Sequence, residues 1–304
     1  MSHTSSKLIA GYRGTVDTWE CDQMKHMNVQ FYSSRASASL AHLLNALGLS
    51  PARIREERRA LKYRDLRIQY MAEMHVGAQM YGVSGVRAVK EDSIQAFTHL
   101  YNAVDDTLSS VSEFNLVYQD LDNGEILNTP LDVLEAAKKL EDPHEDLYCP
   151  APIKSVVMAA KKMEHMFETS RSAVDVWECD AFGNIEISNI IARFSDAASH
   201  IMGSVGITRA MQRERNLGSA ALDYYTEFLR PIRMADSLVL KSGLLDRRPK
   251  NFAFGHHLIN CDTDEIVNCT TVIGCYFDMT ARKSVPLPPE YSSVPDEKLL
   301  KNQL

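Results

Sequence analysis

The segment Val-Asp-x-Trp-Glu-Cys-Asp occurs twice in this chain, first from Val16 and again from Val174. The shift between the two copies is 158 positions, from 16 to 174, and it aligns further residues without a gap. The aligned pairs include Arg35 with Arg193, Ser37 with Ser195, His42 with His200, Gly48 with Gly206, and His99 with His257. A constant shift over about a hundred residues indicates a tandem duplication, so we expect two copies of one domain.

Each copy contains one helical pattern followed by strand-like segments. Apolar residues recur at three- and four-residue steps from Val29 to Leu47 and from Ile187 to Val205, and a glycine follows each pattern. Partial alternation predicts strands, which in the first copy lie at 66–72, 76–89, 93–104 and 107–119. The small residues Ala36, Ser37, Ala38 and Ser39 favour close contact between the helix and a sheet that curls around it. The order of elements predicts an α+β domain.

The repeats set the expected domain boundaries. We predict a first repeat at 8–128, a partly helical connector at 129–168, a second repeat at 169–284 and a C-terminal tail at 285–304. The tail is charged and rich in proline, which predicts surface coil. A chain of 304 residues is long enough for two domains of about 100–150 residues each.

Composition excludes several classes of partner. A net charge of −7 and a pI near 5.8 argue against nucleic acid, since nucleic-acid-binding domains carry concentrated positive charge. No apolar run approaches the roughly 18 residues of a membrane span, and the N-terminus lacks a signal-like apolar region. We therefore expect no membrane partner and a cytoplasmic location. Six cysteines without a CxxC pair predict reduced thiols, with Cys21 and Cys179 as small packed side chains.

The spacing Asp22-x-x-x-His26-x-Asn28-x-x-x-Tyr32 resembles the 4-hydroxybenzoyl-CoA thioesterase type of hotdog acyl-CoA thioesterase. In that family an Asp, a Gly-His-Val-Asn-Asn-like loop and a Tyr lead into the central helix. The resemblance covers roughly 12–124 and 170–282 and implies a tandem (double) hotdog, each a curved antiparallel sheet around one long helix. It also implies that the two copies pair as an intramolecular pseudo-dimer, and a further homodimer remains open.

Both loops depart from the family pattern. In the first copy Lys25 replaces the usual glycine and Val29 replaces the second asparagine. In the second copy the aspartate and the glycine remain, and the other positions have changed. The residues of the second loop are Asp180, Gly183, Asn184 in place of His26, Glu186 in place of Asn28, and Ile190 in place of Tyr32.

Thioester hydrolysis needs a nucleophile or a base for water, and a group that polarises the carbonyl. Asp22 is the candidate for the first role, and sequence alone leaves nucleophile and general base both open. His26 is the candidate to orient the water or hold Asp22, while Asn28 caps the helix and positions the loop. The backbone N–H of Asn28 or Val29 is the predicted oxyanion donor, because it lies at the positive end of the helix dipole.

The second loop leaves two readings open. Asp180, Asn184 and Glu186 form either a variant site with Glu186 as the base or a pocket that binds without hydrolysing. The repeated Asp17, Trp19 and Glu20, which recur as Asp175, Trp177 and Glu178, favour a structural role because they persist whatever the loop chemistry.

No set of His, Cys and carboxylates has metal-ligand spacing, so neither metal nor other cofactor is expected, and coenzyme A enters as part of the substrate. The segment 53–67 holds seven basic residues against three acidic ones, which suits either coenzyme A phosphates or a solvated face.

The leading hypothesis is therefore a thioesterase that converts an acyl-CoA, or another acyl thioester, to a carboxylic acid and a free thiol. A hotdog hydratase or dehydratase is an alternative, although the Asp-x-Asn-Pro-x-His pattern of that branch is not evident. A non-catalytic acyl-CoA-binding protein is a third possibility, against which the intact Asp22, His26 and Asn28 argue.

Overall fold

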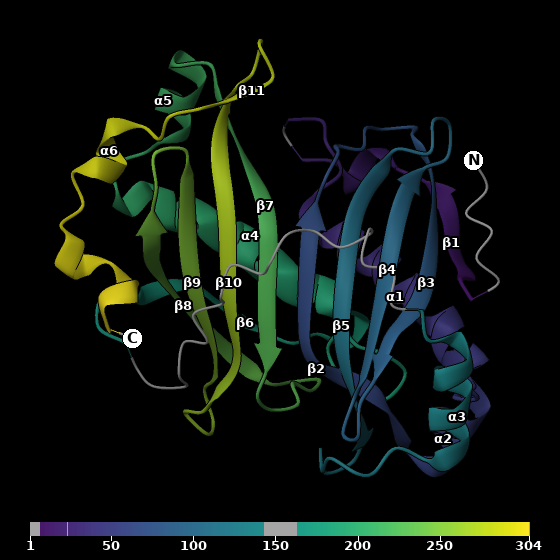
Figure 1. The fold of residues 1–304 in the computed structure, drawn as a ribbon. Helices are drawn as coiled ribbons and strands as arrows, with labels where there is room; N and C mark the ends of the chain where they lie inside the picture. The colour runs from purple at the N-terminus through teal and green to yellow at the C-terminus, as the bar shows by residue number, and fades with distance from the viewer. Residues whose placement is uncertain (1–6, 23, 143–162, 304) are drawn as a thin grey trace. The chain divides into compact units, whose positions relative to one another are not determined.

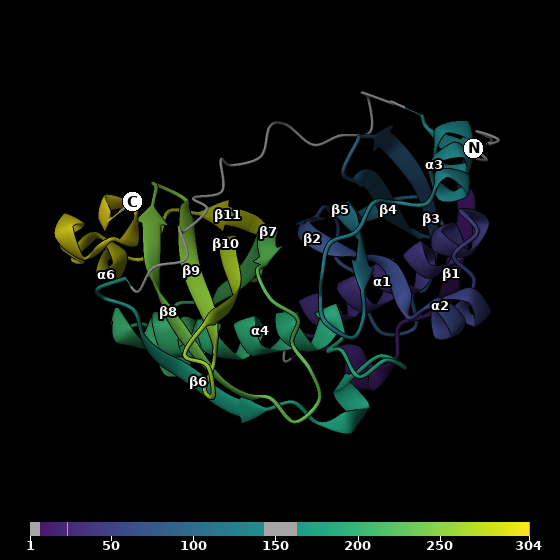
Figure 2. The same cartoon turned by 90° about the horizontal axis from the view of Figure 1, so that it is seen from below.

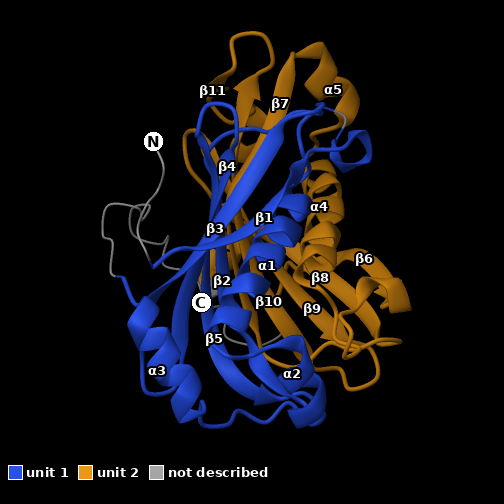
Figure 3. Cartoon of the chain, turned by 90° about the vertical axis from the view of Figure 1, so that its right-hand side faces the viewer, with its two compact units in different colours: residues 1–150 blue, residues 151–304 orange. Residues whose placement is uncertain are grey.

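The computed structural model describes residues 7–22, 24–142 and 163–303. The described chain forms two compact units, residues 1–150 and 151–304, which Figure 3 colours separately. Each unit consists of an antiparallel sheet and one long helix, so the predicted α+β double-hotdog fold is confirmed. No helix in these ranges is long and apolar enough to cross a membrane.

In the first unit five antiparallel strands lie in the order β1-β3-β4-β5-β2, and the helix α1 packs on one face of this sheet against β1, β3 and β4 (Figure 1). The elements are β1 (Ile9–Thr15), η1 (Thr18–Glu20), α1 (Val29–Ala46), α2 (Pro51–Glu57), β2 (Arg59–Tyr70), β3 (Gln79–Val89), β4 (Ile94–Asn102), β5 (Leu108–Asp120) and α3 (Leu131–Leu140).

The second unit repeats this plan in the strand order β7-β10-β9-β8-β6, with β11 added on β10 and α4 packed on β6, β8 and β9 (Figure 2). The elements are β6 (Phe167–Ala173), η3 (Val176–Glu178), α4 (Ile187–Ser204), α5 (Arg209–Glu214), β7 (Leu217–Phe228), β8 (Ser237–Arg247), β9 (Asn251–Asn260), β10 (Ile266–Asp278), β11 (Lys283–Val285), α6 (Pro289–Ser292), η4 (Asp296–Lys298) and η5 (Leu300–Gln303).

The shift of 158 residues found in the sequence holds in the structure. It relates α1 to α4, β2 to β7 and β3 to β8 at both ends of each element. Both long helices are confirmed, and each ends before a glycine, Gly48 or Gly206, whose φ of 88° is the left-handed conformation that stops a helix.

The small residues of α1 allow the predicted close approach of helix and sheet. Ser39 is fully buried, and its hydroxyl accepts a hydrogen bond from the backbone N–H of Tyr12 at 2.9 Å. A Cβ on Gly82 of β3 would lie only 2.2 Å from the Ser39 hydroxyl, so glycine is required there. The larger buried side chains of the helix, Tyr32, Leu40 and Leu43, complete the core, and each such burial contributes about 1.5–3 kcal/mol.

The four predicted strands of the first copy are present, but β1 and β6 were not predicted. Both are edge strands, and the sequences IAGYRGT and FETSRSA lack an apolar alternation. β2 begins at Arg59, earlier than predicted. The first half of this strand is rich in charged residues, so the apolar pattern used for the prediction did not reveal it. The basic segment 53–67 is consequently divided between α2 and β2.

The predicted surface coil at the C-terminus is wrong. The segment 289–303 contains α6 and two short 3-10 helices, η4 and η5, and the side chains of Tyr291, Leu299 and Leu300 are buried. The Tyr291 ring stacks on Phe252 of β9 with centroids 5.8 Å apart. These few apolar side chains anchor a segment whose average composition is polar. In the connector, α3 is helical as expected, and residues 143–162 lie outside the described part.

Candidate functional site

The loop between η1 and α1 brings the predicted site residues of the first unit together. The backbone N–H of Asp22 donates to the carbonyl of His26 at 2.8 Å, and the N–H of Lys25 donates to the carbonyl of Asp22 at 2.9 Å. Lys25 adopts a φ of 66°, the left-handed conformation that its glycine counterpart Gly183 adopts at 80°. The turn therefore has the same backbone in both copies, with a lysine in the strained position of the first.

The carboxylate of Asp22 is oriented by the loop itself. Its Oδ1 accepts hydrogen bonds from the backbone N–H of Met24 at 2.8 Å and of His26 at 3.3 Å. Among the described residues no donor meets the second oxygen, Oδ2, and the side chain is half-buried. One oxygen is thus fixed and the other is available to a reactant.

Asn28 is the N-cap of α1, and its side-chain oxygen accepts a hydrogen bond from the N–H of Gln30 at 3.1 Å. Its own backbone N–H donates to the carbonyl of Glu20 at 2.8 Å. The N–H of Val29, the first residue of the helix, has no acceptor within the described residues. Of the two backbone donors predicted from sequence, Val29 is therefore the one still available to an oxyanion.

The side chain of His26 lies beside two residues that sequence reasoning did not connect with it, Glu73 and His75. Its Nδ1 is 3.3 Å from Oε1 of Glu73, and its ring meets the edge of His75 with centroids 5.0 Å apart. The segment that follows β2 carries both residues and pairs with the loop through an antiparallel bridge between His26 and His75. The contact of His26 with Asp22 described above is made by its backbone N–H.

Tyr32, a residue of α1, holds the segment that carries Glu73 and His75 against this helix. The buried Tyr32 hydroxyl accepts a hydrogen bond from the N–H of Met74 at 3.0 Å, and burial raises the pKa of Tyr32 to about 12. Tyr70 packs edge-on against Tyr32 and donates to the carbonyl of Val29 at 3.3 Å. Both tyrosines therefore hold the segment with Glu73 and His75 against the start of the helix.

The second unit keeps the loop and changes its side chains. Oδ1 of Asp180 accepts from the N–H of Phe182 at 2.9 Å and of Asn184 at 3.0 Å. Asn184 stands opposite Arg233, where the first unit pairs His26 with His75. Glu186 occupies the N-cap position, and its backbone N–H donates to the carbonyl of Glu178 at 2.9 Å.

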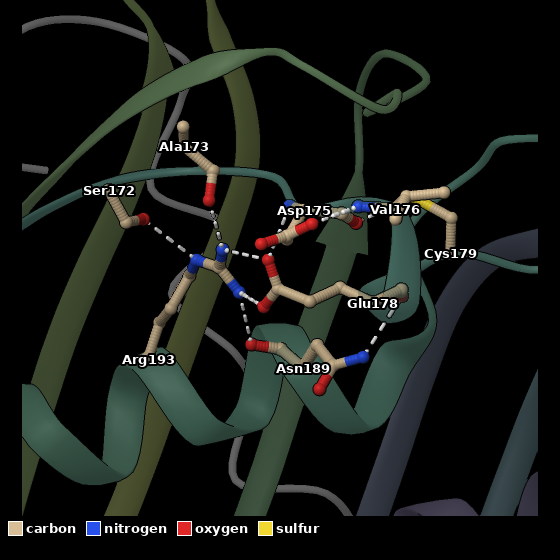
Figure 4. Close-up of polar contacts among 8 residues, drawn as sticks. All are labelled: Ser172, Ala173, Asp175, Val176, Glu178, Cys179, Asn189 and Arg193. Carbon is tan, nitrogen blue, oxygen red and sulfur yellow. Dashed lines mark hydrogen bonds and ion pairs between the residues drawn. The ribbon is translucent and has the colours of Figure 1, made fainter.

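The repeated acidic residues before each loop have the structural role predicted for them. Arg193 of α4 donates two hydrogen bonds to the buried Glu178 carboxylate, at 2.7 and 3.0 Å, and a third to Ser172 at 3.0 Å (Figure 4). Glu178 also accepts from the N–H of Asp175 at 2.8 Å. In the first unit Glu20, which is buried, pairs with Arg35 through a single nitrogen of the guanidinium, Nη2. This buried ion pair joins the loop to the helix in each copy.

The tryptophan of the repeated segment is exposed in both copies, unlike the glutamate beside it. Trp19 and Trp177 are 75% and 73% exposed, so neither indole packs into a core. The cysteines of the segment are free thiols, and burial, together with the adjacent aspartate, raises the pKa of Cys21 and of Cys179. A raised thiol pKa disfavours the reactive thiolate, which agrees with packed side chains.

An antiparallel sheet wrapped around a long helix, twice in one chain and with an aspartate loop before the first helix, defines a double-hotdog protein of the thioesterase class. The chain belongs to the Thioesterase-like superfamily, whose family model matches residues 16–158 and 174–296. The resemblance seen in the sequence is thereby confirmed for both repeats. No curated protein matches the chain in sequence.

Solved structures share this fold across nearly the whole chain. A Lactobacillus plantarum protein, provisionally an oleoyl thioesterase, has a TM-score of 0.70 at 10% identity, covering 90% of this chain and 97% of that one. An acyl-ACP thioesterase from Bacteroides thetaiotaomicron has a TM-score of 0.66 at 10% identity, with 88% and 98% covered. The 12:0-ACP thioesterase from Umbellularia californica has a TM-score of 0.64 at 7% identity, with 89% and 95% covered.

Proposed function

We propose that the protein hydrolyses an acyl-CoA to a free carboxylic acid and coenzyme A, with Asp22 as the nucleophile or the general base. The class of activity, hydrolysis of acyl thioesters, follows from the family. The observation that carries the assignment of residues is the Asp22 carboxylate: within the described part of the chain, two backbone N–H groups hold one of its oxygens and no donor meets the other. The second oxygen either attacks the thioester carbonyl or removes a proton from water.

Charge that develops on the thioester oxygen needs a donor close to this carboxylate. The N–H of Val29 lies at the N-terminus of an 18-residue helix, where the dipole favours negative charge. We assign this N–H as the oxyanion donor. His26 lies in the same loop and supplies an imidazole to orient the water or the carbonyl. In this proposal the chain needs no cofactor, because its own side chains and water complete the reaction.

The second loop is proposed as a site that binds without hydrolysing. It keeps the aspartate orientation through Asp180, but it has Asn184 where the first loop has the imidazole of His26. An asparagine cannot exchange a proton near neutral pH, which removes one of the three groups proposed for catalysis.

Thiol release from a panel of short, long and aromatic acyl-CoAs tests this function. Asp22→Asn preserves the size of the side chain and its acceptor at Oδ1 but removes the carboxylate, so kcat should fall by about 10²-fold or more. The matched variant Asp180→Asn should retain most of the activity. Undiminished hydrolysis by a folded Asp22→Asn protein would refute the assignment, and equal losses in the two variants would show that both loops catalyse.

Acyl carrier protein is the second candidate for the thiol partner, because two of the most similar solved structures are acyl-ACP thioesterases. The two substrates share the phosphopantetheine thioester and differ in the partner that carries it. A comparison of kcat/KM for one acyl chain on coenzyme A and on acyl carrier protein decides between them. A higher value for the carrier-protein substrate would replace acyl-CoA in our proposal.

A further inference from the structure

We propose that His26, Glu73 and His75 form a binding site for a divalent transition metal of the Zn²⁺ class. These three residues offer one ligand atom each, and the three atoms lie within 4.8 Å of one another. Two imidazoles and one carboxylate, with a fourth position left for water, are a ligand set that Zn²⁺ adopts in proteins. The cluster goes beyond thioester hydrolysis, which needs no metal in the mechanism proposed above.

The distances suit the ion. Zn–N and Zn–O bonds of about 2.0–2.1 Å place neighbouring ligands of a tetrahedron about 3.3–3.4 Å apart. Nδ1 of His26 and Oε1 of Glu73 already stand 3.3 Å apart. Glu73 and His75 are both exposed, so their side chains are able to close the remaining separation by rotation. His26 is 12% exposed, which gives the site one shielded ligand and two adaptable ones.

The hydrogen bond made by His75 prepares its ring for a metal. Nδ1 of His75 lies 3.3 Å from the backbone carbonyl of Lys25. A carbonyl only accepts hydrogen bonds, so this nitrogen carries the proton and the other nitrogen, Nε2, keeps its lone pair. Histidine ligands in metal sites are commonly oriented in this way, with the second ring nitrogen donating to a backbone carbonyl.

Both segments that carry the ligands are held in place by backbone hydrogen bonds. His26 and His75 face each other in an antiparallel bridge, and the N–H of Met27 donates to the carbonyl of Met74 at 2.8 Å. The Tyr32 hydroxyl accepts from the N–H of Met74, which ties the same segment to α1. Preorganisation of this kind lowers the entropy lost when an ion binds.

The second unit supplies an internal comparison. At the same shift of 158 residues the three ligand positions are Asn184, Pro231 and Arg233, and the bridge between Asn184 and Arg233 preserves the backbone pairing. None of these side chains is a good ligand, and arginine places a permanent positive charge where the metal would lie. The backbone is therefore common to both copies, while the ligand chemistry belongs to the first alone.

A bound metal would occupy the imidazole of His26 and withdraw it from the reaction. We accordingly assign the site as inhibitory, and this part of the inference rests on the proposed function. The proposal that the metal binds does not rest on the proposed function, because binding is measured on the protein without substrate.

Titration of the full chain with Zn²⁺ against a chromophoric chelator tests the site, and the visible absorption of Co²⁺ reports its geometry. We expect one tight equivalent per chain and a tetrahedral Co²⁺ spectrum. Glu73→Gln and His75→Gln change exposed side chains, so both variants should fold, and each should weaken binding at least tenfold. His42→Gln, which alters an exposed histidine of α1, is the matched control and should bind as the native protein does.

The absence of saturable Zn²⁺ binding, or equal affinity in the native protein and His75→Gln, would overturn the site. Thiol release supplies the second measurement: Zn²⁺ should slow the native protein, a chelator should restore it, and Glu73→Gln should need at least tenfold more Zn²⁺ for the same slowing. Binding without inhibition would overturn the inhibitory role. A native protein that binds Zn²⁺ but hydrolyses no substrate would contradict the proposed function and leave the metal site established.

Discussion

Lys25 occupies a backbone conformation that its counterpart in the other copy reaches with glycine. A side chain with a Cβ costs about 1–2 kcal/mol in the left-handed region. Lys25 is exposed and has a φ of 66°, whereas Gly183 has a φ of 80° with open space around the position of a Cβ. The two positions differ in side chain and share the turn.

We expect Lys25→Gly to raise the free energy of unfolding by about 0.5–1 kcal/mol, because relief of strain exceeds the entropy that glycine adds to the unfolded chain. Gly183→Ala should lower it by about 1 kcal/mol, since no neighbouring atom within 4 Å adds a steric clash to the backbone strain. Denaturant unfolding of both variants measures the effect. A Lys25→Gly protein less stable than the native one would show that the lysine side chain makes a compensating contact.

Residues close together in sequence could be placed in the site before the structure was known. Asp22, His26 and Asn28 belong to one short loop, so their proximity follows from the turn and the helix start. Glu73 and His75 could not be placed, because their position depends on how the segment after β2 pairs with that loop. The hydrogen bond from the N–H of Asn28 to the carbonyl of Glu20 could not be predicted either, because no pattern in the neighbouring sequence indicates it.

At the scale of elements, a buried ion pair connects the short 3-10 helix of each repeat, η1 or η3, to its long helix, α1 or α4. Glu178 and Arg193 are each 9% exposed at the side chain. Burial is the largest single influence and opposes ionisation of Glu178, but the hydrogen bonds from Arg193, the N–H of Asp175 and the charge of Arg193 together outweigh it and hold the pKa of Glu178 below its ordinary value of 4.5. A lowered carboxyl pKa contributes stability that is present above about pH 4.5 and is lost as the pH falls through the folded-state pKa.

Glu178→Gln should therefore lower the free energy of unfolding by about 3 kcal/mol at pH 7, because Arg193 is left buried without its partner. The same variant should lose less stability than the native protein on acidification below pH 4.5. Denaturant unfolding at pH 7 and pH 4 measures both effects. The double variant Glu178→Gln with Arg193→Met is the control, and it should recover part of the loss. Equal stability of the native and Glu178→Gln proteins would contradict the role of the pair.

Elements with a strong periodic signal were predictable, and elements at sheet edges were not. The apolar steps from Val29 and from Ile187 identify α1 and α4 because one face of each helix must meet the core. The edge strands β1 and β6 carry no apolar alternation because their residues are exposed or half-buried, apart from Thr169 of β6, which is buried. Three buried side chains, those of Tyr291, Leu299 and Leu300, anchor the C-terminal helices. They were not predicted, because the average composition of the segment is polar.

At the scale of the whole molecule, duplication has left two units with one backbone plan and different buried polar groups. In the first unit Ser84 and Thr98 form a buried hydrogen bond of 2.6 Å between β3 and β4. In the second unit the same two positions are Ser242 and His256, whose hydrogen bond is 2.8 Å. Burial lowers the pKa of His256 to about 3, with a further contribution from the neighbouring His257.

This difference predicts that the second unit is the more sensitive to acid. A histidine with a lowered folded-state pKa is neutral when folded and takes up a proton on unfolding, so stability falls as the pH drops from about 6.5 toward 3. By proton linkage, one such histidine lowers the free energy of unfolding by roughly 2 kcal/mol between pH 7 and pH 5. His256→Thr, which introduces the residue of the first unit, should abolish the part of the loss that comes from His256 and leave the part from His257, whose pKa burial lowers to about 4, even if the smaller side chain lowers stability at pH 7. Hydrogen exchange in β9 and in β4 at both pH values separates the units: β9 of the native protein should lose protection at pH 5 while β4 changes less. Equal loss in the two strands, or an unchanged pH dependence in His256→Thr, would show that the buried histidine does not set the acid limit of the protein.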